Sequence, residues 1–416
     1  MTTTLPETFT GPVAPPEPDL TPDEIVARAE ELASTLVERQ AETERRGYYA
    51  EDTHEAFSRA GFYRILVPRQ YGGYEFGPAT FLKVATALAR GCPSTGWMYL
   101  FGAAHALVVG TLFDERTQAE LFAGGDFICP ATVAPAGTAT RTGDGWLLDG
   151  TWNYCSGAPY ATHFIGHSLV FSDPDQPPAP LLFIAPREKF ERLEDWGDQL
   201  GLKGSGSHSI RIEQARIPAH HALIGHLSQI PVTEETPGRL LHGPEYGGGP
   251  LSFMLLELGA LAVGIAKGGL DAYEELMRSR TTAFFPIVAR TEDPDFQFRF
   301  GEATGLIAAA EAAVNDAVRQ WQELCLKEAA AFTREEELRL ATISREAVRL
   351  CWRAVEGQLF PTAGSSSVRA GHRIERVWRD PVDPAQPRRQ RHLPGHPRQP
   401  RTGPCPLRHR SVIRGR

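Results

Sequence analysis

Hydrophobic and polar positions change rhythm twice along the chain. Between Phe127 and Pro218, apolar residues come in short runs bounded by Gly, Pro, Asp and Ser, which is typical of strands and turns. On both sides of this region, apolar residues recur at the 3.6-residue spacing of a helix face. The pattern predicts a β unit between two helical blocks, with small polar residues on its rims as the candidates for chemistry. The strand-like runs are 127–133, 145–157, 181–186 and 204–212.

The helical block before the β unit starts with a clear signal. Thr21 is the expected N-cap, Pro22 the first helical residue and Glu24 the partner in a capping box. Residues 1–20 are rich in Thr and Pro without periodicity, so they are interpreted as a disordered leader. Further helices are expected at 51–60, 78–90, 94–113 and 114–122.

The helical block after the β unit is predicted to be an antiparallel bundle. Long helices joined by short links pack in this way, and Thr333 with Glu336 forms a second capping box. The expected helices are 250–281, 296–326 and 334–359. The resulting division is a helical domain at 21–125, a central β domain at 126–230 and a helical bundle at 231–380.

Residues 381–416 do not follow the pattern of the preceding chain. They hold nine Arg, eight Pro and a single acidic residue, Asp383. One interpretation is a disordered basic tail. The other is a slip of the reading frame near Asp380, because Arg, Pro, His and Gly dominate shifted readings of GC-rich DNA. Both interpretations stay open on the sequence.

Composition and charge exclude several classes of protein. The net charge of −8 argues against nucleic acid as a partner, since such binding depends on clustered Lys and Arg. The six scattered cysteines contain no C-x-x-C pair and fit reduced thiols in the cytoplasm. No signal peptide is evident. The apolar run 251–270 contains Glu257 and Lys267, which favours a buried helix over a membrane span.

Motifs for other common chemistries are missing from the sequence. Its histidines show no H-E-x-x-H or similar spacing, so no metal site is predicted. The sequence has no G-x-S-x-G elbow and no P-loop, which removes serine hydrolases and P-loop nucleotide hydrolases. The Gly-Ser-rich segment 204–207 precedes a strand rather than a helix, so it is not a dinucleotide fingerprint.

Several phrases together resemble the acyl-CoA dehydrogenase superfamily over residues 22–380. They are Val67–Gly73, Gly201–Ser207, Ala215–Pro218, Leu270-Asp271 with Arg280, and Arg376–Asp380. The resemblance implies an α+β fold with an N-terminal helical domain, a central β-barrel or sandwich, and a C-terminal antiparallel helix bundle. It also implies a homotetramer, for which the Gly- and Ala-rich helix at 251–270 offers close packing.

Within the superfamily, other phrases resemble the oxygenase component of two-component flavin-dependent monooxygenases of the p-hydroxyphenylacetate hydroxylase type. They are Ser94–Trp97 with His105 eight residues later, Pro130–Gly137 and Trp152–Gly157. The Q-x-x-G-G-x-G-Y phrase of the dehydrogenases is not found at 358–367, and no E-G-T follows Asp380. The monooxygenase branch is therefore favoured.

The resemblance implies a particular set of cofactors and partners. A separate NAD(P)H:flavin reductase supplies reduced flavin, FMNH2 or FADH2, which reacts with O2 to give a C4a-hydroperoxyflavin that hydroxylates an aromatic or phenolic small molecule. The protein then has to bind and orient both molecules and exclude water. The alternatives are an acyl-CoA dehydrogenase, an N- or S-oxygenating monooxygenase of the same fold, and a non-catalytic scaffold without flavin.

The resemblance also assigns roles to individual residues. Ser156 is placed beside flavin N5, where its hydroxyl can donate and accept, and His105 is the candidate general base toward a phenol. A turn serine and a core histidine are the structural alternatives. The remaining cofactor-binding candidates are Thr132 as a donor to the flavin ring, Trp152 as a wall of the flavin site, Ser207 as a donor to phosphate or ring edge, and Arg280 as a partner of flavin phosphate.

Overall fold

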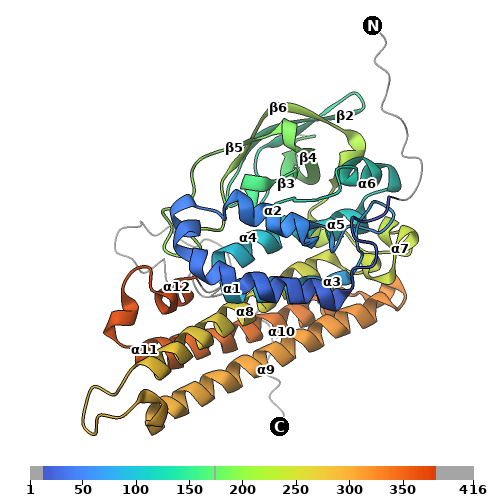
Figure 1. Cartoon of the computed structure of the whole chain (residues 1–416). Coiled ribbons are helices and arrows are strands. Elements are labelled where there is room, and N and C mark those ends of the chain that lie inside the picture. The colour runs from blue at the N-terminus through green and yellow to red at the C-terminus, as the bar shows by residue number, and fades with distance from the viewer. Residues whose placement is uncertain (1–12, 173–174, 381–416) are drawn as a thin grey trace, which may run out of the picture.

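The computed structural model describes residues 13–172 and 175–380. Figure 1 shows three regions: a β domain at the top, the N-terminal helices beneath it, and a bundle of long helices at the bottom. The predicted fold class is therefore confirmed. The boundaries of the three parts stay predictions, and the tail at 381–416 lies outside the described residues.

The N-terminal helices begin with the predicted capping box, in which Thr21 and Glu24 bond to each other's backbone N–H. Residues 13–20 differ from the predicted leader. Val13 pairs with Tyr71 and Leu20 is buried, because this segment covers apolar side chains of the first helices. Residues 1–12 of the predicted leader lie outside the described residues. The helices are α1 (Pro22–Arg46), α2 (Glu51–Arg59), α3 (Gly77–Gly91), α4 (Pro93–Ala103), α5 (His105–Leu112) and α6 (Glu115–Phe122).

The β domain is one seven-stranded sheet in the order β5-β6-β2-β1-β3-β4-β7. All neighbouring strands are antiparallel except β1 and β3. Trp152, Phe164 and Phe183 lie in its separate hydrophobic core. The strands are β1 (Thr138–Thr142), β2 (Gly145–Trp152), β3 (His163–Val170), β4 (Ala179–Pro186), β5 (Glu191–Arg192), β6 (Ile210–Pro218) and β7 (Ala222–Ile224).

Two predicted strand segments are not strands. Residues 127–133 make only an isolated bridge, Ala131 to Ile165, because Cys129 N donates instead to Gly102 O on α4 and Pro130 has no N–H to donate. Residues 204–209 form a loop before β6. Each segment also bonds to the N-terminal helical region, through Cys129 N to Gly102 O and through Gly206 N to Gly47 O.

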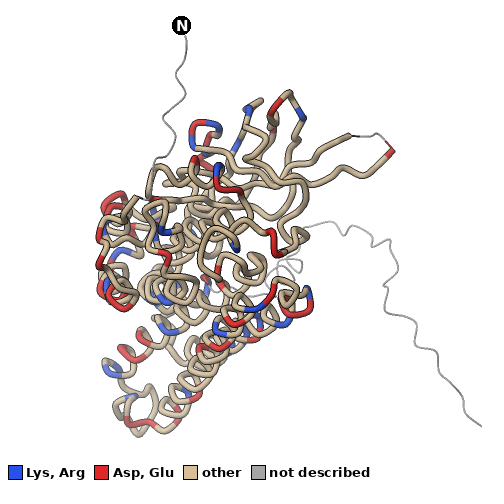
Figure 2. Tube along the Cα trace, turned by 90° about the vertical axis from the view of Figure 1, so that its right-hand side faces the viewer, with Lys and Arg blue, Asp and Glu red and all other residues tan. Residues whose placement is uncertain are grey.

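The bundle consists of α8 (Pro250–Ser279), α9 (Pro294–Cys325) and α10 (Arg334–Trp352), which pack on one another side by side (Figure 1). Helix α10 continues as a π-helix, η9 (Arg353–Leu359). The short helices are α7 (Pro237–Leu241), α11 (Phe360–Thr362) and α12 (Arg373–Arg379). Lys and Arg alternate with Asp and Glu along these helices (Figure 2).

Helices α3 and α8 join the two helical regions at close range. A Cβ on Gly264 would lie 2.4 Å from Thr86 O, and one on Gly268 would lie 2.4 Å from Arg90 O. Only glycine permits this approach. The stretches Pro93–Leu112 and Pro250–Ser279 are long and apolar enough to cross a membrane, but 89% and 72% of their apolar windows are buried inside the protein. Both are core helices here.

Candidate active site

A chain of hydroxyl groups joins the end of β2 to α4. The Ser156 Oγ accepts a hydrogen bond of 2.9 Å from Trp97 Nε1 and lies 2.7 Å from the Ser207 Oγ. Ser207 is in turn 2.7 Å from the Ser205 Oγ. The structure therefore brings together two predicted residues that are 51 positions apart, Ser156 and Ser207.

Gly157 allows the turn after β2 to approach α4. Its φ is +100°, a left-handed conformation that residues with a Cβ rarely adopt. A Cβ at this position would lie 3.0 Å from the Cα of Gly102. Glycine at position 157 thus allows the turn to come close enough to α4 for Ser156 to bond Trp97.

His105 is buried at the start of α5 with a defined tautomer. Its Nδ1 lies 2.8 Å from Cys129 O and 3.0 Å from Phe101 O, and carbonyl oxygens only accept, so Nδ1 carries the proton. The Nε2 lone pair has no hydrogen-bond partner among the described residues. Burial lowers the pKa of His105 to about 4. The ring is therefore neutral at pH 7 and offers an acceptor at Nε2.

Thr132 also presents an unpaired polar atom. Its Oγ1 is buried without a partner in the described part of the chain, whereas its carbonyl accepts from His167 Nδ1 at 2.9 Å. His167 in turn accepts at Nε2 from Leu227 N, at 3.1 Å. The backbone of Thr132 is thus fixed and its hydroxyl remains available to a ligand.

Trp152 lies in the core of the β domain. It is 1% exposed, its Nε1 donates to His167 O at 2.9 Å, and its ring packs edge-on against Phe164 and Phe183. These contacts satisfy the indole completely. Its role as a wall of the flavin site stays a prediction.

Arg280 follows α8 and belongs to a cationic site on the bundle. Its Nη1 donates to Ala363 O at 3.2 Å and to the Ser367 Oγ at 3.3 Å, and Arg290 also reaches Ala363 O, at 3.3 Å. Burial and the neighbouring Arg280 lower the pKa of Arg290. Neither guanidinium has a carboxylate partner within the described ranges, so the positive charge of both is available to an anion.

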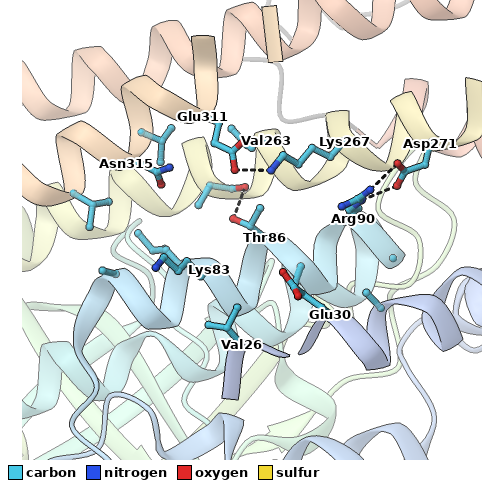
Figure 3. A pocket seen from close by; sticks show the side chains of 18 of the residues that line it. Val26, Glu30, Lys83, Thr86, Arg90, Val263, Lys267, Asp271, Glu311 and Asn315 are labelled. Atoms are coloured by element: carbon cyan, nitrogen blue, oxygen red, sulfur yellow. Dashed lines mark hydrogen bonds and ion pairs between the residues drawn. The ribbon is translucent and has the colours of Figure 1, made fainter. Parts of the chain in front are cut away.

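A second candidate site lies away from these residues. A groove of about 980 Å³ lies among α1, α3, α8 and α9, and ion pairs of Lys267 with Glu311 and of Arg90 with Asp271 line it (Figure 3). Helix α3 separates this groove from the site, because its other side carries Phe81, which packs on Tyr99 of α4. We therefore assign the chemistry to the Ser156 and His105 region.

Sequence reasoning missed Trp97, Ser205 and Arg290 as parts of these sites. Trp97 was already within the Ser94–Trp97 phrase, and Ser205 follows the same pattern of small polar residues as Ser207. Arg290 has no comparable signal in the sequence. The spacing of residues does not reveal that the loop 281–289 folds back and brings Arg290 next to Arg280. A hydrogen bond of 3.0 Å from Arg290 N to Arg280 O closes that loop.

A cluster of possible metal ligands also forms in space. The Glu120 Oε2 lies 2.8 Å from His220 Nε2 and 3.0 Å from His221 Nε2. Arg116 occupies the other carboxylate oxygen, and His221 Nδ1 has no acceptor among the described residues. A metal-bound histidine normally donates its second N–H to an acceptor, so we assign the cluster to joining α6 and the turn before β7.

Comparison with known proteins places this geometry in a family. Residues 21–117 match the acyl-CoA dehydrogenase N-terminal domain, and residues 256–382 match the acyl-CoA dehydrogenase C-terminal domain. Together the matches cover more than half of the chain. The chain therefore belongs to the acyl-CoA dehydrogenase superfamily, and within it to the oxygenase components of flavin-dependent monooxygenases.

The second assignment rests on individual relatives. The chain is 29% identical to the flavin-dependent monooxygenase oxygenase subunit HsaA of Rhodococcus jostii, over 85% of this chain and 91% of the relative. It is 26% identical to the FADH2-dependent resorcinol hydroxylase oxygenase component of a Rhizobium, over 77% and 79%. The crystal structure of the HsaA monooxygenase from M. tuberculosis matches with a TM-score of 0.78 and 25% identity, over 87% of this chain and 91% of that chain.

Proposed function

We propose that this protein uses reduced flavin and O2 to hydroxylate an aromatic, phenolic small molecule. The observation that carries this proposal is the buried His105, whose Nδ1 proton is fixed by two carbonyls and whose Nε2 lone pair is free. Such a ring accepts a hydrogen bond from a phenol and takes up its proton as the ring carbon becomes a nucleophile. The relatives named as hydroxylases support the same chemistry.

The residues present fit a flavin. The unpaired Thr132 Oγ1 and the Ser156 hydroxyl supply a donor and a donor-acceptor for the ring edge. Arg280 and Arg290 supply positive charge for phosphate groups. When bound, the reduced flavin supplies two electrons that activate O2 for transfer of one oxygen atom. The chain's own part is to hold the two molecules in register and to keep water out.

A separate reductase follows from this reaction, since nothing among the described residues resembles a nicotinamide site. We propose that it uses NAD(P)H and passes on reduced flavin by diffusion. The five described cysteines are all free and buried, which supports the cytoplasm as the location of the protein.

We also propose a homotetramer. The loop between α8 and α9 projects from one end of the bundle (Figure 1), and Phe284, Phe285 and Ile287 on it are 86%, 90% and 56% exposed. Large apolar side chains this exposed are typical of association surfaces. Arg280 and Arg290 flank the same loop. A neighbouring copy that binds to this loop would therefore contact the proposed flavin phosphate site formed by these two arginines.

The test is rapid mixing of the protein, loaded anaerobically with reduced flavin, against oxygenated buffer. A transient absorbance before oxidised flavin appears, followed by conversion of a phenol, is the expected result. Direct oxidation without any transient, together with reduction of oxidised flavin by an acyl-CoA thioester, would overturn the proposal in favour of a dehydrogenase. Absence of any flavin binding would leave only the scaffold alternative.

A further inference from the structure

Glu257, in α8, has a buried carboxyl group without a hydrogen-bond partner among the described residues. The residue is 0% exposed, and neither carboxyl oxygen has a hydrogen-bond partner in the part of the chain that the structure describes. Burial raises the pKa of Glu257 well above its usual range. Other half-buried acids of the bundle are paired, as Glu311 is with Lys267 at 2.5 Å. A carboxyl without a partner lowers the stability of the fold.

The neighbours along α8 define the direction in which Glu257 points. Phe253, four positions earlier, packs against Phe81 of α3 with 6.3 Å between the ring centroids. Gly264, seven positions later, contacts Thr86 and Ala89 of the same helix. Residues at these spacings share one helix face. Glu257 therefore faces α3 and the helix that packs on it, α4.

Partly exposed side chains lie beside this face. Met254 and Leu258 adjoin Glu257 on α8 and are only partly buried, although α8 is a core helix. Helix α8 packs on α4, α5 and η5 (Leu227–Gln229). These elements carry Trp97 and His105 and hold His167 through Leu227 N. Helix side chains lean toward the N-terminus, which carries the carboxyl toward Met254.

We propose that Glu257 is a specificity-determining residue that binds a hydrogen-bond donor of the aromatic substrate, at the end remote from the hydroxylated carbon. The inference rests on the proposed function and names its substrate class: an aromatic molecule with a second polar group, a hydroxyl or an N–H. The donor completes the hydrogen bonding of the carboxyl. A ring without a donor leaves it bare, and sites of this kind discriminate strongly against such rings.

The experiment compares wild type with Glu257→Gln, Glu257→Leu and the control Glu245→Gln. Glu245 lies in the short helix η6 (Pro244–Gly247), is also partly buried and bonds Gln322 of α9, so the control removes a carboxyl without touching Glu257. The first readout is binding of 1,5-dihydroxynaphthalene and of 1-naphthol to the flavin-free protein. The second is KM and kcat for the same pair in the loaded enzyme.

For wild type, we expect the dihydroxy compound to bind at least tenfold more tightly than 1-naphthol. Glu257→Leu abolishes this preference, raises KM with little change in kcat, and raises Tm, because a bare buried carboxyl has been removed. Glu257→Gln keeps part of the preference, and Glu245→Gln keeps all of it. An unchanged preference in Glu257→Leu overturns the inference. Failure of the proposed function gives a different result: no wild-type hydroxylation of either compound.

Discussion

At the scale of single residues, His105 is the side chain whose state is best defined. Its Nδ1 donates to Cys129 O and Phe101 O, and its Nε2 is the atom left to accept from a ligand. In the proposed mechanism, removing that acceptor removes proton transfer from the phenol and does not alter Ser156 or Thr132, the proposed flavin contacts.

For His105→Gln we therefore expect hydroxylation to fall by roughly 10²–10⁴-fold. Reoxidation of the flavin continues, so that O2 is consumed without product. Stopped-flow absorbance with product analysis measures both. His163→Gln is a control, since His163 is a partly buried histidine whose pKa is also lowered to about 4 by burial. Equal losses in the two variants would indicate general disruption of the interior instead.

The sequence indicates the chemical type of the site residues better than their partners. Ser156 and Ser207 stand at turns and rims, where strand patterns leave small polar residues visible, and the structure brings them together. Trp152 follows the ordinary rule that a large aromatic in a strand is core. Spacing along the chain does not show that the Glu257 carboxyl lacks a hydrogen-bond partner, or that Arg290 lies beside Arg280. Both depend on how distant segments pack.

At the scale of elements, the contact of the β2 turn with α4 depends on a glycine. Gly157→Ala forces both a strained φ and a Cβ only 3.0 Å from Gly102. Gly143→Ala is the matched control, because Gly143 also has a positive φ, +54°, but a Cβ there meets nothing within 4 Å.

We expect Gly157→Ala to lower the free energy of unfolding by about 2–4 kcal/mol and Gly143→Ala by about 1 kcal/mol. Urea unfolding measures both. Flavin affinity should fall only in Gly157→Ala, since Ser156 moves away from Trp97. Equal effects of the two substitutions would show that the close approach to α4 has no energetic role.

The layer between α5 and the sheet also contains histidines that must stay neutral. Burial lowers the pKa of His105, His163 and His167 to about 4 each, below the ordinary value of about 6.5. The unfolded chain binds these protons first, so stability is complete above pH 6.5 and is lost as the pH falls toward 4.

One such histidine removes about 3 kcal/mol of unfolding free energy by pH 4. Denaturant titrations between pH 7 and 4.5 should therefore show a steep decline, and His163→Phe should make it shallower. His163 already stacks on Phe127 with 5.0 Å between the ring centroids, so phenylalanine is compatible with its surroundings. A variant profile parallel to that of wild type would exclude His163 as a contributor.

At the scale of the whole molecule, the fold class follows from the two hydrophobic periods and the capping boxes. The failures at 127–133 and 204–209 share one feature: each segment places a backbone N–H on the N-terminal helical region, Cys129 on Gly102 and Gly206 on Gly47. A hydrophobic period of two does not reveal such partners. The ordered residues 13–20 likewise depend on a distant surface, through the pairing of Val13 with Tyr71.

Association through the α8–α9 loop gives a prediction at this scale. Phe285→Asp should reduce the oligomer to smaller species in analytical ultracentrifugation and weaken flavin binding by at least tenfold, because the loop also positions Arg280. Phe298→Asp is a control, since Phe298 is 65% exposed on α9. A monomeric wild type would contradict the assembly.

The anchoring of the 201–207 loop has a consequence for biosynthesis. Leu202 N donates to the Asp380 Oδ1 at 2.8 Å, and Arg379 pairs with Glu44 of α1. A growing polypeptide has released all the described strands and the helices before α12 by the time these two residues leave the ribosome. The loop that carries Ser205 and Ser207 is therefore anchored late, so nascent chains have a sheet and most of their helices before the proposed flavin site is complete.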